Sequence, residues 1–171
     1  MLWDDHWDQN EPMLVKLTNE QKLQLVLQSL SYAFEYLVNH ANFPDELRQT
    51  MESIVSSIAK HQVVAEADQQ KLELLIEQYE DDDLNADQPG ILDMLLACQF
   101  FHSPVKGFDD DAVGDCLSYC YQVAHNIEVV AAMEEGEVLD ESELQVLEEQ
   151  SAVCLEFIRF QFDLLRRLAA E

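Results

Sequence analysis

The apolar residues of this chain recur at steps of three and four, the spacing that places them on one face of an α-helix. A first helix is predicted to start at Thr18, because Thr18 and Gln21 have the spacing of a capping box, in which each side chain bonds the backbone N–H of the other. Its apolar stripe is Leu23, Val26, Leu27, Leu30, Phe34 and Leu37. The segment "ANFPDEL" ends this pattern, and Pro44 suits the first turn of a second helix. The second stripe is Leu47, Met51, Ile54, Val55 and Ile58.

Three further helices are predicted in the middle of the chain. The third covers residues 68–79 and leads into "EDDDLNADQPG", which has the composition of a loop. The fourth begins at Pro89 or Gly90 and runs to Phe101. It is apolar on nearly every side, so it should lie at the centre of the fold. The fifth presents an inward face of Val113, Cys116, Leu117, Cys120, Val123, Ala124, Ile127 and Val130.

The sixth and longest predicted helix is capped by Asp140 and Glu143. It carries two apolar stripes, which are Leu144, Leu147, Leu155, Ile158, Phe162 and Leu165 on one side and Val153, Phe157, Phe160 and Leu164 on the other. Two stripes need two neighbours, either two layers of one fold or one layer and a second subunit. A homodimer formed through this last helix is therefore one prediction.

The fold class that follows is all-α, a single-domain compact bundle of about six helices over residues 18–171. The period-two alternation of a strand is absent. Residues 1–17 form an acidic N-terminal lead that carries Trp3 and Trp7. One helical turn would place both rings on one face, and we expect them to dock on the chain's own domain rather than on a partner, because such rings are usually buried.

The net charge of the chain limits the classes of partner that it can bind. Thirty-five acidic residues oppose nine basic ones, which gives a formal charge of −26. This field repels nucleic acid and anionic lipid and attracts basic proteins and cations, so we expect no direct nucleic-acid binding and no membrane association. The alternative explanation of the charge is a generally acidic surface that suits a salt-tolerant host and serves no particular partner. The longest near-apolar run, residues 91–101, is too short to span a bilayer.

The start of the chain and its cysteines indicate a compartment. "MLWDDHWDQNE" lacks the basic and apolar regions of a signal peptide. Cys98, Cys116, Cys120 and Cys154 lack the spacing of a disulfide framework or a zinc site. Both observations favour a reduced, cytoplasmic protein.

Asp93 is the one acid in the apolar stretch "PGILDMLLACQFFHS", which ends near His102. Asp93 falls in the first turn of its helix, where a carboxylate accepts free backbone N–H groups and complements the positive end of the helix dipole. His102 meets the negative end. We therefore interpret Asp93 as a residue that starts a helix; the alternative is a buried acid with a raised pKa.

The spacing of the possible metal ligands gives little support to a metal site. An alternation like that of the early ligands in an EF-hand calcium loop is found at Asp81, Asp83, Asn85 and Asp87. However, Ala86 stands where that loop has its turn glycine, and Leu92 stands where it has its bidentate glutamate.

Cys116 and Cys120 share a helix face with core residues, while His125 points away from Cys120, so we expect the thiols to pack rather than to bind zinc. His125 and Glu128 could supply half of a di-metal site, without a second Glu-x-x-His motif to complete it. No cofactor is expected, because the chain has four glycines and no nucleophile elbow or phosphate-binding loop.

Three segments resemble the uncharacterised YjaG-like family of small helical bacterial proteins. They are "QPGILDMLLACQFFHSPVKG", the acidic approach "QKLELLIEQYEDDDL", and "GEVLDESELQ" followed by "AVCLEF". The resemblance covers residues 30–168 loosely. It implies an all-helical cytoplasmic domain without an assigned activity, and it transfers no catalytic residues.

Two hypotheses of function follow. The first is a non-enzymatic domain that works through protein contacts and binds a basic partner at faces around residues 66–87 and 134–149. The second is a metal-dependent enzyme or small-molecule binder that uses Asp93, His102, His125 and Glu128. Nucleic-acid mimicry, which needs carboxylates spaced like phosphates, is a third use of the same charge.

Overall fold

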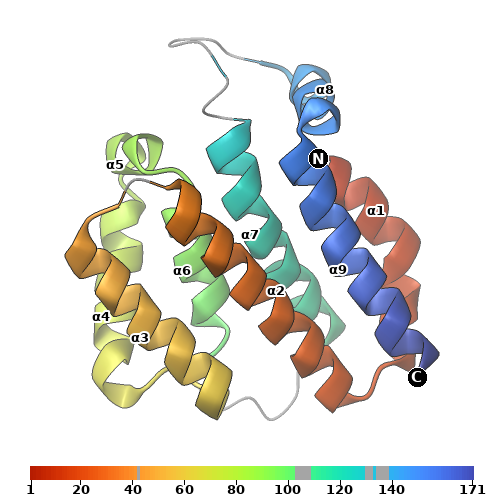
Figure 1. Ribbon diagram of the computed structural model, residues 1–171, viewed down its shortest axis with the longest axis horizontal. Helices are drawn as coiled ribbons and strands as arrows, with labels where there is room; N and C mark the ends of the chain where they lie inside the picture. The colour runs from red at the N-terminus through yellow and green to blue at the C-terminus, as the bar shows by residue number, and fades with distance from the viewer. Residues whose placement is uncertain (42, 103–108, 130–132, 134–138) are drawn as a thin grey trace.

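The computed structural model describes residues 1–41, 43–102, 109–129, 133 and 139–171, and this part of the chain is helical without strands (Figure 1). The all-α prediction is therefore confirmed. The elements in chain order are α1 (Leu2–Asn10), the 3-10 helix η1 (Glu11–Lys16), α2 (Asn19–His40), α3 (Asp45–His61), α4 (Glu66–Tyr79), α5 (Asp82–Asp87), α6 (Ile91–Gln99), α7 (Asp110–Glu128), α8 (Glu141–Gln150) and α9 (Ala152–Ala170).

These residues form more helices than the six or so that the apolar pattern predicts. The acidic lead contains α1 and η1. The segment expected to be a loop after α4 contains α5, where the Asp81 side chain accepts a hydrogen bond from the backbone N–H of Leu84 at 3.3 Å. This is an ordinary N-cap, and it starts a short helix in a segment whose composition indicates a loop.

The last predicted helix is two helices, which corrects the sequence-based prediction. The chain leaves helical geometry at Ser151 (φ −76°, ψ 112°), whose hydroxyl accepts a hydrogen bond from the backbone N–H of Cys154 and so caps α9. The capping box of Asp140 and Glu143 is confirmed, but it opens α8 alone. Because the apolar pattern resumes directly after the break, it does not reveal Ser151 as a boundary.

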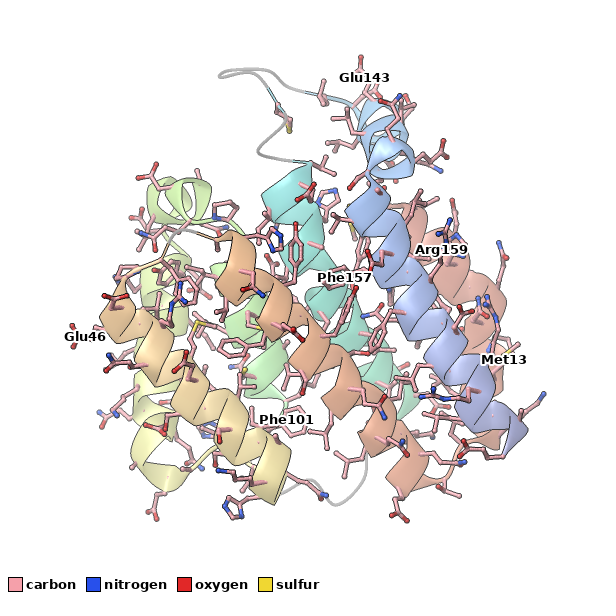
Figure 2. The ribbon with its side chains drawn as sticks, viewed as in Figure 1. Met13, Glu46, Phe101, Glu143, Phe157 and Arg159 are labelled. Carbon is pink, nitrogen blue, oxygen red and sulfur yellow. The ribbon has the colours of Figure 1, made fainter. Side chains whose placement is uncertain are left out.

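The core is built around α6 and α7, which lie in the middle of the molecule. Helix α6 is enclosed by α2, α3, α4 and α7, as its apolar sequence predicts. Helix α7 contacts α2, α6 and α9, and α2 crosses in front of it in Figure 1. Phe101 and Phe157, labelled in Figure 2, are both buried, and Phe157 lies against Tyr32 and Tyr36 of α2.

The apolar stripes of α9 are largely covered by α2, α7, α8, α1 and η1 of the same chain. The buried members are Phe157, Ile158, Phe162, Leu164 and Leu165. The stripes therefore no longer favour a second subunit, and the homodimer stays a prediction without this support.

The N-terminal lead packs on the bundle, as predicted. Trp3 is buried and stacks on Trp7, with 5.2 Å between ring centroids. The Trp3 indole N–H donates to Gln161 Oε1 at 2.7 Å, and Gln161 Nε2 donates to the Leu117 carbonyl at 2.9 Å. Gly114 makes room for Trp7, because a Cβ at that position would lie 2.7 Å from the indole. In the part of the chain that the structure describes, no helix has both the length and the hydrophobicity to cross a membrane.

Candidate functional site

Two of the four residues predicted as metal ligands lie together. Asn126 joins them, because its Nδ2 donates to Asp93 Oδ2 at 2.6 Å and its Oδ1 lies 3.2 Å from His125 Nδ1. Glu128, one turn further along α7, accepts a hydrogen bond from the Tyr36 hydroxyl of α2. This hydrogen bond makes Glu128 part of the packing of α7 against α2.

His102 lies at the opposite end of α6 from Asp93. Its Nε2 is 3.5 Å from Glu73 Oε1 of α4, and its carbonyl accepts a hydrogen bond from Gln69 at 3.0 Å. Among the described residues, no three His, Cys, Asp or Glu side chains are placed to hold a metal ion together. The four predicted residues therefore do not converge on one site.

Asp93 has both of the environments that the sequence presents as alternatives. It lies in the first turn of α6, so its predicted position at a helix start is confirmed. Its side chain is also 5% exposed, and burial raises the pKa of the Asp93 carboxyl against the opposing effect of the hydrogen bond from Asn126. A helix start alone therefore does not account for Asp93: it is a buried acid held by an amide.

His125 is a buried residue, which its predicted position away from Cys120 does not indicate. The residue is 9% exposed, because α9 packs on α7 and Glu148 of α8 lies next to the imidazole. Its Nε2 lies 3.4 Å from Glu148 Oε1 of α8 and has no hydrogen-bond partner among the described residues.

Glu148 is the centre of a buried polar cluster that sequence reasoning missed. The residue is buried, its Oε1 accepts a hydrogen bond from the Tyr121 hydroxyl at 2.9 Å, and its Oε2 accepts one from the backbone N–H of Leu2 at 2.7 Å. The surrounding sequence "LEEQ" is typical of a solvent-facing helix. No sequence signal separates Glu148 from its exposed neighbour Glu149, because the burial depends on where α8 turns at Ser151.

The hydroxyl and thiol groups next to Glu148 hold their protons tightly. Burial raises the pKa of the Tyr121 hydroxyl well above its usual value, and it also raises the pKa of the nearby Cys154 thiol. Both groups are therefore protonated near neutral pH and are poor nucleophiles. The arrangement ties α1, α7 and α8 together rather than presenting a reactive group.

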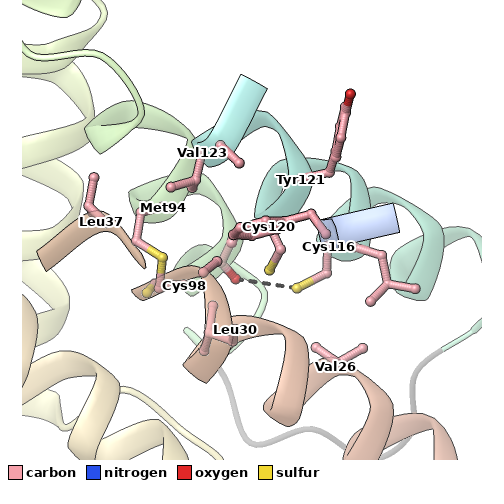
Figure 3. Close-up of a cluster of buried hydrophobic side chains, with 14 of the residues drawn as sticks. Val26, Leu30, Leu37, Met94, Cys98, Cys116, Cys120, Tyr121 and Val123 are labelled. Atoms are coloured by element: carbon pink, nitrogen blue, oxygen red, sulfur yellow. Dashed lines mark hydrogen bonds between the residues drawn. The ribbon is translucent and has the colours of Figure 1, made fainter. Parts of the chain in front are cut away.

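The remaining cysteines pack in the core, as their place among apolar residues predicts (Figure 3). Cys98, Cys116 and Cys120 are buried and unpaired. The Cys116 thiol lies 3.7 Å from the carbonyl oxygen of Ala97, and burial raises the pKa of the Cys98 thiol.

An open groove of about 480 Å³ lies between α3 and α4. Its lining residues are Pro44, Glu46, Leu47, Thr50, Lys71, Leu74, Leu75, Gln78 and Tyr79. Its volume lies within the roughly 300–1,000 Å³ of typical binding pockets. Leu74 is 57% exposed, which is unusual for a large apolar side chain in this molecule.

A buried acid fixes the two walls of this groove. Asp68 of α4 accepts hydrogen bonds from Ser53 of α3 at 2.9 Å and from Lys71 Nζ at 3.0 Å. The hydrogen bond from Lys71 is the main reason that the pKa of Asp68 lies below its ordinary value. The groove is therefore braced at a point where α3 and α4 meet, and the ammonium group of Lys71 is already engaged.

Comparison with known proteins finds no match: no protein family, no curated protein and no solved structure is significantly similar to this chain. Its membership of the YjaG-like family accordingly stays a prediction from the sequence segments quoted above.

Proposed function

We propose that the protein is a non-enzymatic interaction domain that binds a basic protein partner. The observation that carries this proposal is a stripe of exposed carboxylates along α4. Its members, at steps of seven, four and three, are Glu66, Glu73, Glu77 and Glu80. These steps place all four on one face of the helix, and 14 residues of helix span about 21 Å.

A row of like charges on one rigid helix is costly unless solvent or a partner of opposite charge meets it. The wider region strengthens the field, because residues 45–87 contain twelve acidic and three basic residues. Such a surface steers a basic partner toward the molecule and speeds association at low ionic strength.

The second acidic face is carried by α8. Its exposed carboxylates are Glu141, Glu143 and Glu149. Glu134 and Glu135, which the sequence also assigns to this face, lie outside the described residues. We propose α4 as the partner's main contact, because it carries this stripe and also one wall of the groove between α3 and α4.

The metal-dependent alternative has weaker support. It has the contact of Asp93 with His125 through Asn126, but His102 lies apart and Glu128 is bound to Tyr36. We also propose a reducing compartment such as the cytoplasm, since the four cysteines are unpaired and buried.

The experiment is retention of protein partners from a lysate on the immobilised protein at low and high salt, with identification of what is eluted. We expect basic proteins that elute as salt rises. A variant with Gln at the four positions of the α4 stripe should retain less of them. The control carries the same charge change at exposed sites elsewhere, Glu11, Glu20, Glu35 and Glu171, and should retain them as the wild type does.

Equal loss in both variants would mean that net charge, and not the α4 stripe, drives retention. If no protein is retained at either salt concentration, the proposal is wrong.

A further inference from the structure

We infer that the groove between α3 and α4 receives the apolar face of a basic amphipathic helix supplied by the partner. This inference rests on the proposed function and deepens it, because it names the chemistry that distinguishes a partner from any other cation.

The first support is the position of Leu74. It lies in the groove at 57% exposure, beside the half-buried Leu75 and over the buried Leu47. A large apolar side chain that stays wet in the free protein becomes an anchor when a partner covers it, and such anchors carry much of the energy of an interface. The two other large apolar residues with high exposure in the described chain, Val15 and Val146, do not line this groove.

The second support is the charge on both banks of the groove. Glu46 lines it from α3. On α4, the exposed Glu77 lies one turn after Leu74, outside the groove lining. The cation in the lining, Lys71, is bound to Asp68, so the negative charge at the groove comes from Glu46 and, next to Leu74, from Glu77. An occupant with an apolar centre flanked by Lys or Arg complements this pattern.

The third support is the shape. The groove runs between two helices, and a helix packs well into the furrow between two others when its side chains fit between theirs. Amphipathic helices bind such furrows through apolar anchors spaced three and four residues apart. The hydrogen bond from Ser53 of α3 to Asp68 of α4 links the two walls before binding, which lowers the ordering cost of association.

The test uses two fluorescently labelled synthetic peptides of leucine and lysine with the same composition. In one, the leucines share a helix face; in the other, the order is shuffled so that they do not. Anisotropy titrations at two salt concentrations give both affinities. We expect the amphipathic peptide to bind wild-type protein more tightly than the shuffled one, with affinity that falls as salt rises.

Leu74→Ser should weaken the amphipathic peptide about tenfold, which corresponds to about 1.4 kcal/mol. The matched control is Val146→Ser on α8, where an apolar side chain with 49% exposure is removed away from the groove. It should leave the affinity unchanged. Thr50→Arg, which places bulk and positive charge in the groove, should weaken binding independently, and circular dichroism melts confirm that each variant is folded.

The outcomes separate the two proposals. If both peptides bind in a salt-dependent way and Leu74→Ser and Thr50→Arg have no effect, the groove inference is wrong while an acidic interaction surface survives. If neither peptide binds at either salt concentration, the proposed function fails as well. Sedimentation analysis tests the remaining candidate occupant of the groove, a second copy of this chain. A dimer that Leu74→Ser dissociates would show that this second copy fills the groove and would overturn the inference.

Discussion

Glu148 Oε2 accepts a hydrogen bond of 2.7 Å from the backbone N–H of Leu2, a residue 146 positions earlier in the chain. The same carboxylate accepts a second hydrogen bond from Tyr121. A fully buried acid thus connects three separate helices. Since a buried carboxylate is costly unless it is hydrogen-bonded, these contacts add to the packing that holds α1 and α8 on the bundle.

Removal of this carboxylate should destabilise the protein. Glu148→Ala leaves the Tyr121 hydroxyl and the Leu2 N–H buried without their acceptor, and we expect a loss of about 2–4 kcal/mol in the free energy of unfolding. Urea denaturation measures it. The control is Glu149→Ala on the exposed side of α8, which should change stability by less than about 0.5 kcal/mol. Equal effects of the two substitutions would contradict the buried cluster.

Asp93 should make stability decrease as pH rises. Its pKa is raised by burial, so the folded state holds the Asp93 proton more tightly than the unfolded state does. The resulting stabilisation is complete below the ordinary pKa of 3.8 and is lost as pH rises through the folded value. Compared with Asp93→Asn, the wild type should therefore lose relative stability as pH rises from the ordinary value of 3.8 through the folded pKa, as measured by urea unfolding at each pH. Parallel pH profiles would show that Asp93 is not the titrating group.

Asp68 should have the opposite pH dependence. Its pKa is lowered, chiefly by the hydrogen bond from Lys71, so its contribution is present above the ordinary pKa of 3.8 and is lost as pH falls through the folded value. Asp68→Asn should lower stability near neutral pH, and the difference from wild type should shrink in acid. Asp87→Asn, at an exposed position on α5, serves as the control and should follow the wild type throughout. A difference from wild type that is constant with pH would rule out this role for Asp68.

Gly114 should be needed for the docking of the N-terminal segment. Gly114→Ala places a methyl group 2.7 Å from the Trp7 indole, which has to move away from its stack on Trp3. We expect a loss of about 1–3 kcal/mol and a red shift of tryptophan emission as the rings become wetter. Asp115→Ala, on the exposed side of the same helix, should leave the emission unchanged. An unshifted spectrum in Gly114→Ala would mean that α1 tolerates the added methyl group.

The features that the sequence predicts well are local ones. The capping box of Thr18 and Gln21 is confirmed, with hydrogen bonds in both directions, because its geometry depends on four consecutive residues. The burial of α6 is confirmed as well, since a helix that is apolar on nearly every side has to be enclosed.

What the sequence does not reveal depends on contacts between distant segments. The break at Ser151 is hidden because apolar residues continue at helical spacing on both sides of it. The burial of Glu148 and His125 is hidden for the same reason, because it follows from the contacts of α8 and α9 with α1 and α7, which no local pattern encodes. The groove between α3 and α4 likewise exists only once the two helices are packed. A sign of it in the sequence is Leu74, an apolar residue on an otherwise polar helix face.

The N-terminal tryptophans have a consequence for how the molecule is made. Trp3 and Gln161 are bonded partners, yet a ribosome synthesises them 158 positions apart. Since chains emerge from the ribosome N-terminus first, the first helix leaves it long before its binding surface exists. The two aromatic rings then lack the surface that covers them until α9 has been synthesised. Docking of the N-terminal segment is thus tied to synthesis of α9, and a product truncated before α9 would display an exposed aromatic pair that chaperones and proteases recognise.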